Sequence, residues 1–166
     1  LVAWRVQVAI ALVQAWGWIW YSRAFVGARA ARLERLATPG LLGGAAVALV
    51  PGAVLDGRLS DRAYPSLGVV YHQASTTRFG ALLLFGTLVA AALVLARFLR
   101  AWRTGVRDAG IMSAAFAMIL VVGTNDALVV MRIVDGPYLL DLGFSLTVLL
   151  VGWVVTGRFV EASRGL

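Results

Sequence analysis

The sequence contains no lysine and no cysteine, and its single histidine is His72. Without lysine the chain cannot form a retinal Schiff base or a lysine-linked pyridoxal phosphate. Without cysteine it offers no ligands for an iron–sulfur cluster, no thioether attachment for haem and no thiol nucleophile. It also shows no Gly-rich phosphate-binding loop and no catalytic triad. We therefore expect these residues to carry no enzymatic activity.

Apolar residues dominate what is present. Of the 166 residues, 61% are hydrophobic, whereas soluble domains are roughly 45–50% apolar. They gather in five runs that approach the roughly 20 residues a helix needs to span a bilayer. The runs are residues 6–25, 40–55, 79–96, 109–131 and 139–157, and the second contains Pro51-Gly52. We expect an all-α fold: one integral membrane domain, residues 1–166, of about five transmembrane helices.

The 15 basic residues are all arginine and give a net charge of +7. In a soluble protein this charge would suggest nucleic acid. Here the arginines lie in short segments between apolar runs, where they set membrane topology instead. Ten fall on one side of a five-span chain: Arg23, Arg29, Arg32, Arg35, Arg97, Arg100, Arg103, Arg107, Arg158 and Arg164. The positive-inside rule predicts an external N-terminus and a cytoplasmic C-terminus, in a bacterial cytoplasmic membrane.

The tryptophans support a membrane location, because amphipathic rings prefer the membrane–water interface. Trp16, Trp18 and Trp20 cluster at the predicted inner end of the first run, and Trp102 and Trp153 also lie near the inner face. We interpret all five as interface anchors. Trp16 and Trp20 share a helix face, which leaves open a stacked pigment or quinone, or a lipid. No cofactor is firmly implied.

The longest loop, residues 56–77, is predicted to be external. It contains an Asp-Gly pair, the Tyr64-Pro65 pair and a β-prone stretch at residues 67–71, a combination that indicates a small hairpin or an ordered loop. His72 lies in this loop. A lone loop histidine is usually solvated or hydrogen-bonded. It is a weak candidate for a pigment or metal ligand, because no second ligand stands at metal spacing.

Asn125 and Asp126 interrupt the fourth apolar run. A carboxylate at the centre of a span costs roughly 2.5–3.5 kcal/mol on insertion scales. Asp126 precedes Arg132 by six residues, about 9 Å along a helix, which puts it in the outer third, where the cost is smaller. Two interpretations stay open. The pair could form a site for a ligand, proton or signal, or a hydrogen-bonded cluster that fixes helix packing.

Asp141 opens the fifth run just after Pro137-Tyr138. An acid in a first helical turn offsets the helix dipole and can satisfy free N–H groups, which is the favoured interpretation. Asp141, Asp126 and Arg5 could converge at the outer rim. The ligand or signal candidates are Asn125, Asp126, Asp141, Arg5 and Tyr138.

Four segments carry a family resemblance: residues 68–80 (GVVYHQASTTRFG), 95–110 (LARFLRAWRTGVRDAG), 125–144 (NDALVVMRIVDGPYLLDLGF) and 157–164 (GRFVEASR). Together they resemble the multi-helix membrane input region of bacterial sensor histidine kinases. In that group an Asn-Asp helix and a Pro-Tyr-Leu turn precede a signalling helix that leads into PAS or kinase domains. The resemblance covers residues 68–164, and the first two runs fit it more loosely.

The resemblance implies a sensory input module whose partner is a cytoplasmic kinase or PAS domain. No kinase lies within these residues, so we expect either a fragment of a longer chain or a module reused without a kinase. The alternative is a structural accessory subunit of a photosynthetic or respiratory membrane complex. Its partners would be the lipid bilayer and neighbouring subunits, or a second copy. A transporter ranks third, since no inverted repeat is visible.

The fifth run also makes a structural prediction. The residues beyond it, 158–164, contain no proline, and most tolerate a helix. Arg158 and Glu161 stand three apart and can pair on one face. We expect this helix to continue past the membrane without a break, to about Ser163.

Overall fold

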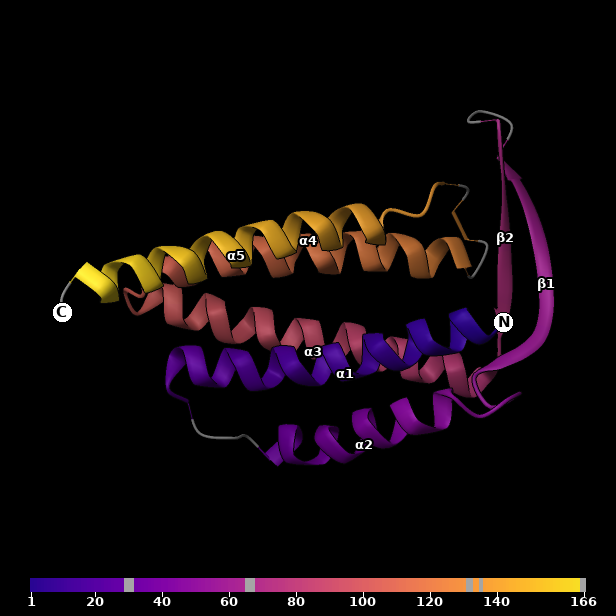
Figure 1. The fold of residues 1–166 in the computed structure, drawn as a ribbon, viewed down its shortest axis with the longest axis horizontal. Helices are drawn as coiled ribbons and strands as arrows, with labels where there is room; N and C mark the ends of the chain where they lie inside the picture. Colours follow the sequence, from indigo (N-terminus) through magenta and orange to yellow (C-terminus); the bar gives the residue numbers. More distant parts are fainter. Residues whose placement is uncertain (29–31, 65–67, 131–132, 135, 165–166) are drawn as a thin grey trace. The chain divides into compact units, whose positions relative to one another are not determined.

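The computed structural model describes residues 1–28, 32–64, 68–130, 133–134 and 136–164. Its elements in chain order are α1 (Val2–Val26), α2 (Arg32–Ala48), β1 (Leu55–Tyr64), β2 (Val69–Thr76), α3 (Arg78–Arg103), α4 (Arg107–Val130) and α5 (Leu140–Arg164) (Figure 1). The chain forms two compact units, Leu1–Ala90 and Ala91–Leu166, which divide within α3.

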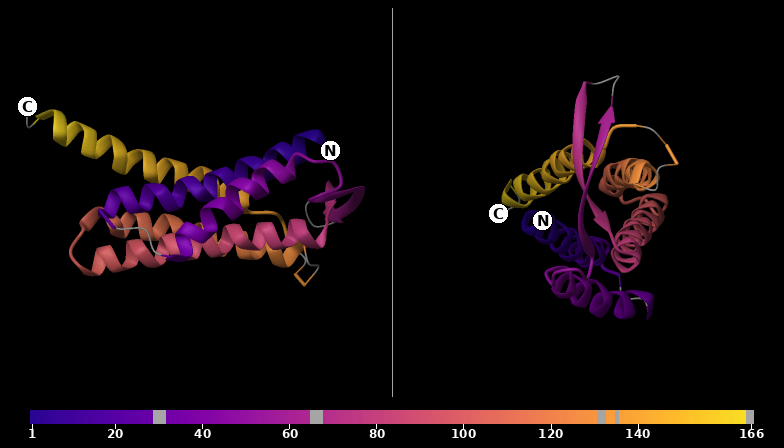
Figure 2. Two further views of the ribbon diagram at one scale, coloured as in Figure 1. Left: turned by 90° about the horizontal axis from the view of Figure 1, so that it is seen from below. Right: turned by 90° about the vertical axis from the view of Figure 1, so that its right-hand side faces the viewer.

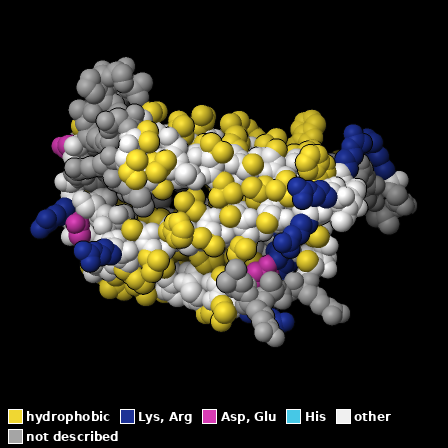
Figure 3. All heavy atoms as spheres, turned by 180° about the vertical axis from the view of Figure 1, so that it is seen from behind, with side chains coloured by type: hydrophobic (Ala, Val, Ile, Leu, Met, Phe, Trp, Pro, Cys, Tyr) yellow, Lys and Arg dark blue, Asp and Glu magenta, His cyan; other side chains and the backbone are white. Residues whose placement is uncertain are grey.

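Four of the described helices are long and apolar enough to cross a membrane: α1, α3, α4 over Arg107–Val129 and α5 over Leu142–Val160. Hydrophobic side chains cover much of the helical surface, and arginine and acidic side chains lie nearer the helix ends (Figure 3). Helices that are long and apolar enough to span a membrane therefore form at four of the five predicted positions. The 17-residue α2 is not among them, so the fifth span stays a prediction.

The predicted bounds of the second helix are wrong. The apolar run covers residues 40–55, whereas α2 begins at Arg32, ends at Ala48 and contains Pro39. After Ala48 the chain unwinds through short turns, in which the Leu49 and Val50 N–H groups bond to carbonyls three residues back. Pro51 explains the end of the helix, because its ring lacks an N–H and clashes with the preceding turn. The last residue of the run, Leu55, is the first residue of β1.

In the first unit, α1 and α2 run antiparallel and side by side (Figures 1 and 2). The buried side chains of α1 recur at helical spacing and include Leu12, Ala15 and Ile19. They form one face, as expected for a helix that packs along a stripe. Gly44 of α2 lies against this region: a Cβ there would stand 2.8 Å from Leu83 and 3.6 Å from Leu12. The missing side chain permits close helix approach.

The loop between α2 and α3 is the hairpin that the turn signals predicted. β1 and β2 pair antiparallel, with Tyr64 opposite Val69 and Leu59 opposite Ala74. An irregularity between Leu55 and Leu59 coincides with the Asp-Gly pair. There the Asp56 carboxylate accepts a hydrogen bond from the Arg58 N–H, and Gly57 adopts φ +82°. The Asp-Gly signal therefore marks a bulge in β1, not the hairpin turn.

Thr77 joins the hairpin to α3. Its N–H donates to the Val54 carbonyl at 2.9 Å, and its hydroxyl donates to the Ala53 carbonyl at 2.8 Å. The same hydroxyl accepts the Gly80 N–H at 3.0 Å, which is the arrangement of a helix N-cap. A Cβ on Gly80 would overlap the Val54 carbonyl oxygen. Glycine is therefore required where α3 starts against this turn.

In the second unit, α4 packs on the later half of α3 and on α5. The Phe98 and Phe116 rings lie 5.6 Å apart between centroids and are both buried. A Cβ on Gly143 of α5 would overlap the side chain of Val122 on α4. The buried Thr147 hydroxyl bonds to the Gly143 carbonyl at 2.9 Å and reaches the Ala115 carbonyl at 3.3 Å. Small and hydroxyl side chains thus bring α4 and α5 close together.

The prediction of an unbroken fifth helix is confirmed. α5 runs from Leu140 to Arg164, four residues beyond the candidate span that ends at Val160. Its 25 residues correspond to about 37 Å, against about 30 Å for the hydrocarbon core.

We predict that α2 crosses the membrane, because only then do the Arg-rich segments before α2 and after α3 share one side. Reporter fusions at Ala28, Arg62 and Arg100 test this. A cytoplasmic reporter should be active at Ala28 and Arg100 and inactive at Arg62. Cytoplasmic activity at Arg62 would overturn the orientation, and identical sides for Ala28 and Arg62 would remove α2 as a span.

Candidate functional site

The Asp126 carboxylate lies at the start of α5, although it belongs to α4. Its Oδ1 atom accepts a hydrogen bond from the Leu139 N–H at 2.8 Å. Leu139 directly precedes α5, and its carbonyl accepts the N–H of Gly143, the first bond of the helix. The first N–H groups of any helix lack partners within that helix. Asp126 therefore acts as a capping group supplied from 13 residues earlier in the chain.

Asn125 completes this arrangement. Its Nδ2 group donates to Asp126 Oδ1 at 3.0 Å and to the Pro137 carbonyl at 3.1 Å. A side-chain amide nitrogen carries two hydrogens, so both donors are used. The two side chains thus hold both ends of the Pro137–Leu139 segment. We call Asn125, Asp126 and the backbone of Pro137 and Leu139 the α4–α5 latch.

The chemistry of the latch is electrostatic positioning. A carboxylate near a helix N-terminus is favoured by the helix dipole as well as by the hydrogen bond. In a membrane these backbone groups also have little water to replace a lost partner. Asp126 is half-buried and bonded to groups at the start of the neighbouring helix. The interpretation of a hydrogen-bonded cluster that fixes helix packing is therefore supported, and a role in binding stays a prediction.

Of the other predicted site residues, some lie at the latch and others do not. Tyr138 lies between the two latched backbone groups and is half-buried. Asp141 is the second residue of α5, as expected for a first-turn acid, but its side chain lies outside the described residues. Arg5 is a half-buried residue of α1, in the other unit. The convergence of Asp126, Asp141 and Arg5 stays a prediction.

His72 lies in β2, opposite Asp61 in the register of the hairpin. Its side chain is outside the described residues, so its role as a pigment or metal ligand is untested. Within the described part of the chain, no three His, Cys, Asp or Glu side chains gather closely enough to hold a metal ion.

The predicted tryptophan anchors differ in exposure. Trp16 and Trp18 of α1 are half-buried, whereas Trp20 is exposed. Trp102, in the last turn of α3, and Trp153 of α5 are also exposed. A Cβ added to Gly110 would stand 3.0 Å from the Trp102 indole nitrogen, so this ring lies across the start of α4. Exposed indoles suit the interfacial role.

A second link between α4 and α5 was not predicted. Arg158 Nε donates to Asp108 Oδ2 at 2.8 Å, between the last part of α5 and the first turn of α4. Sequence reasoning considered only Glu161 as a partner of Arg158, and the Glu161 side chain lies outside the described residues. The sequence did contain a signal for this pair. Asp108 lies in the first turn of α4 and Arg158 in the last part of α5, and antiparallel packing of the two helices brings these parts together. Both side chains are more than a third exposed, so the pair contributes little free energy.

We predict that Asp126→Ala destabilises the pairing of α4 and α5 by about 1 kcal/mol, because the Leu139 N–H loses its acceptor. Asp126→Asn should retain most of the stability, since an amide oxygen can still accept this bond. Thermal unfolding in micelles and hydrogen exchange at the Leu139 amide measure the effect. Thr124→Ala, at an exposed position of the same helix, is the control. Unchanged exchange at Leu139 in Asp126→Ala would contradict the assignment of the cap.

Comparison of the chain with known protein families, with curated proteins and with solved structures gives no match. The function is therefore argued from the residues and from the geometry of the α4–α5 latch. The resemblance to sensor input regions rests on the four quoted segments alone, and one of them contains every residue of the latch.

Proposed function

We propose that the chain is a membrane sensory input module, with its N-terminus outside and its C-terminus in the cytoplasm of a bacterium. A stimulus at the outer face or within the membrane changes the packing of α5 against α4. The inner end of α5 then passes this change to a cytoplasmic signalling partner. The observation that carries the proposal is the unbroken helix α5, whose first residue follows the latch directly.

Continuity of α5 supports transmission because a helix with an intact hydrogen-bond ladder moves as a rod. No proline interrupts Leu140–Arg164. The helix extends past Val160, where its candidate span ends. An unbroken helix therefore offers a route by which a displacement or rotation at the latch reaches the other end of α5.

The links between α4 and α5 support a defined resting arrangement. The latch holds one end of the pair, and Asp108–Arg158 joins the other end. Asp108 and Asp126 are 18 residues apart in one helix, about 27 Å. Between these links, Gly143 and Thr147 fit closely on Val122 and Ala115. A stimulus changes the packing of α4 and α5 only if its ligand binds two arrangements of the helices with different affinity. We propose that these two arrangements differ in whether the latch is formed.

A structural accessory subunit is the second candidate, and the exposed surface of α5 favours it. Only 17% of the α5 span is buried within the chain. Trp153 is 79% exposed and would suit an interface with another subunit as well as lipid. A subunit held by such lateral contacts needs neither the latch nor a continuous cytoplasmic extension in order to assemble.

Two glycines inserted between Val160 and Glu161 of the full-length protein separate the candidates. In a sensor, Asp126→Ala should alter the phosphorylation of the cytoplasmic partner, and the insertion should abolish that alteration while membrane insertion stays normal. The same two glycines inserted after Gly105, in the turn between α3 and α4, are the control for chain length, because they leave α5 intact. If the latch variant and the insertion both leave output and assembly unchanged, transmission through α5 is wrong and the accessory subunit is the better account.

A further inference from the structure

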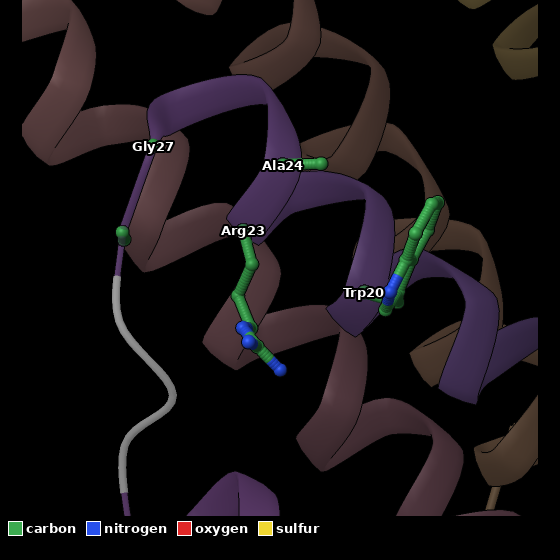
Figure 4. A pocket seen from close by; sticks show the side chains of 5 residues that line it. Trp20, Arg23, Ala24 and Gly27 are labelled. Atoms are coloured by element: carbon green, nitrogen blue, oxygen red, sulfur yellow. The ribbon is translucent and has the colours of Figure 1, made fainter.

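The last two turns of α1 contain an open hollow of about 230 Å³, lined by Trp20, Arg23, Ala24, Gly27 and Ala28. We call it the α1 hollow. Trp20 and Arg23 project from neighbouring turns, while Ala24 and Gly27 add little bulk (Figure 4). The helix ends here because Gly27 adopts φ +68°, and the Ala28 N–H closes the turn on the Arg23 carbonyl at 3.1 Å.

Arg23 contributes a guanidinium group to the wall of this hollow. Within the described part of the chain, its Nε atom is buried and has no hydrogen-bond partner. A buried donor without an acceptor is unfavourable, so native structures usually supply one. The Arg23 guanidinium is planar, and its terminal nitrogens can donate to two oxygens of a phosphate. A single negative charge with two oxygens is therefore the complementary ligand.

The surface of α1 that leads away from the hollow is apolar. Val6, Ile10, Val13 and Trp20 are all exposed, and their spacing of three, four and seven places them on one face. Gly17, on the same face, has open space around it. The stripe from Val6 to Trp20 is about 21 Å long, more than half of the roughly 30 Å hydrocarbon core. The stripe is therefore long enough to accompany an acyl chain through one leaflet, and it adjoins the cationic group.

We propose that the α1 hollow binds the phosphate of an anionic phospholipid, whose acyl chain lies along the Val6–Trp20 stripe. Arg23 binds the phosphate oxygens, and the Trp20 indole lies at the level of the headgroup, where such rings are favoured. The small side chains of Ala24 and Gly27 leave room for the glycerol backbone. The adjoining apolar stripe selects a lipid over a free anion. This proposal is independent of whether the module senses a stimulus.

The test uses the intact chain in micelles, with phosphatidylglycerol or phosphatidylcholine of equal chain length added, and native mass spectrometry to count bound lipid. The wild type should prefer phosphatidylglycerol. Arg23→Gln should reduce that preference roughly tenfold, the loss expected for charge-assisted hydrogen bonds. Ala24→Leu should also weaken binding, because it fills the hollow while it leaves the charge in place.

Arg103→Gln is the matched control, since it removes an exposed arginine from the last turn of α3, and it should keep the preference. Equal losses in the Arg103 and Arg23 variants would reduce the effect to general charge attraction and overturn the site. Unchanged binding in both Arg23→Gln and Ala24→Leu would overturn it as well. Displacement of phosphatidylglycerol by inorganic phosphate would assign the hollow to a soluble anion and contradict the lipid.

Discussion

The hydrogen bond from the Leu139 N–H to the Asp126 carboxylate fixes where α5 begins, and the rest of the second unit depends on that position. From Leu139, the residues of α5 that contact α4 follow at helical spacing: Gly143 and Thr147, with Arg158 as the last. All lie on one face. A start displaced by one residue would rotate this face away from α4, remove Gly143 from Val122 and separate Arg158 from Asp108.

The latch also explains why a carboxylate is tolerated in an apolar helix. Asp126 compensates its desolvation with the Leu139 N–H, the Asn125 amide and the positive end of the α5 dipole. The Leu139 N–H and the α5 dipole belong to the neighbouring helix and the residue before it, so the polar cluster holds α4 and α5 together. The α4–α5 latch is compatible with both candidate functions. In a sensor its hydrogen bonds would break on stimulation, whereas in a structural subunit they would stay formed. The difference lies in whether the far end of α5 responds.

Much of the helical framework could be predicted from the apolar runs, because bilayer thickness dictates the length of a span. The end of α2 was misplaced because residues 49–55 are as apolar as a span, while Pro51 and the start of β1 override that pattern. Asn125 and Asp126 could be identified as special from their cost in lipid. Their partners could not, because a backbone N–H such as that of Leu139 has no signature in the sequence. Asp108 and Arg158 are 50 residues apart, and their pairing requires the antiparallel register of α4 and α5.

The central claim is that the latch at one end of α5 sets the position of the other end. The chain contains no cysteine, so spin labels can be attached to introduced cysteines alone. Ile111 of α4 and Phe159 of α5 are exposed and lie near the Asp108–Arg158 end of the pair. Dipolar EPR between labels at these two positions, in bilayers, compares the intact latch with Asp126→Ala. The account predicts a shifted or broadened distance distribution when the latch is removed. An unchanged distribution, together with faster hydrogen exchange at Leu139, would contradict it.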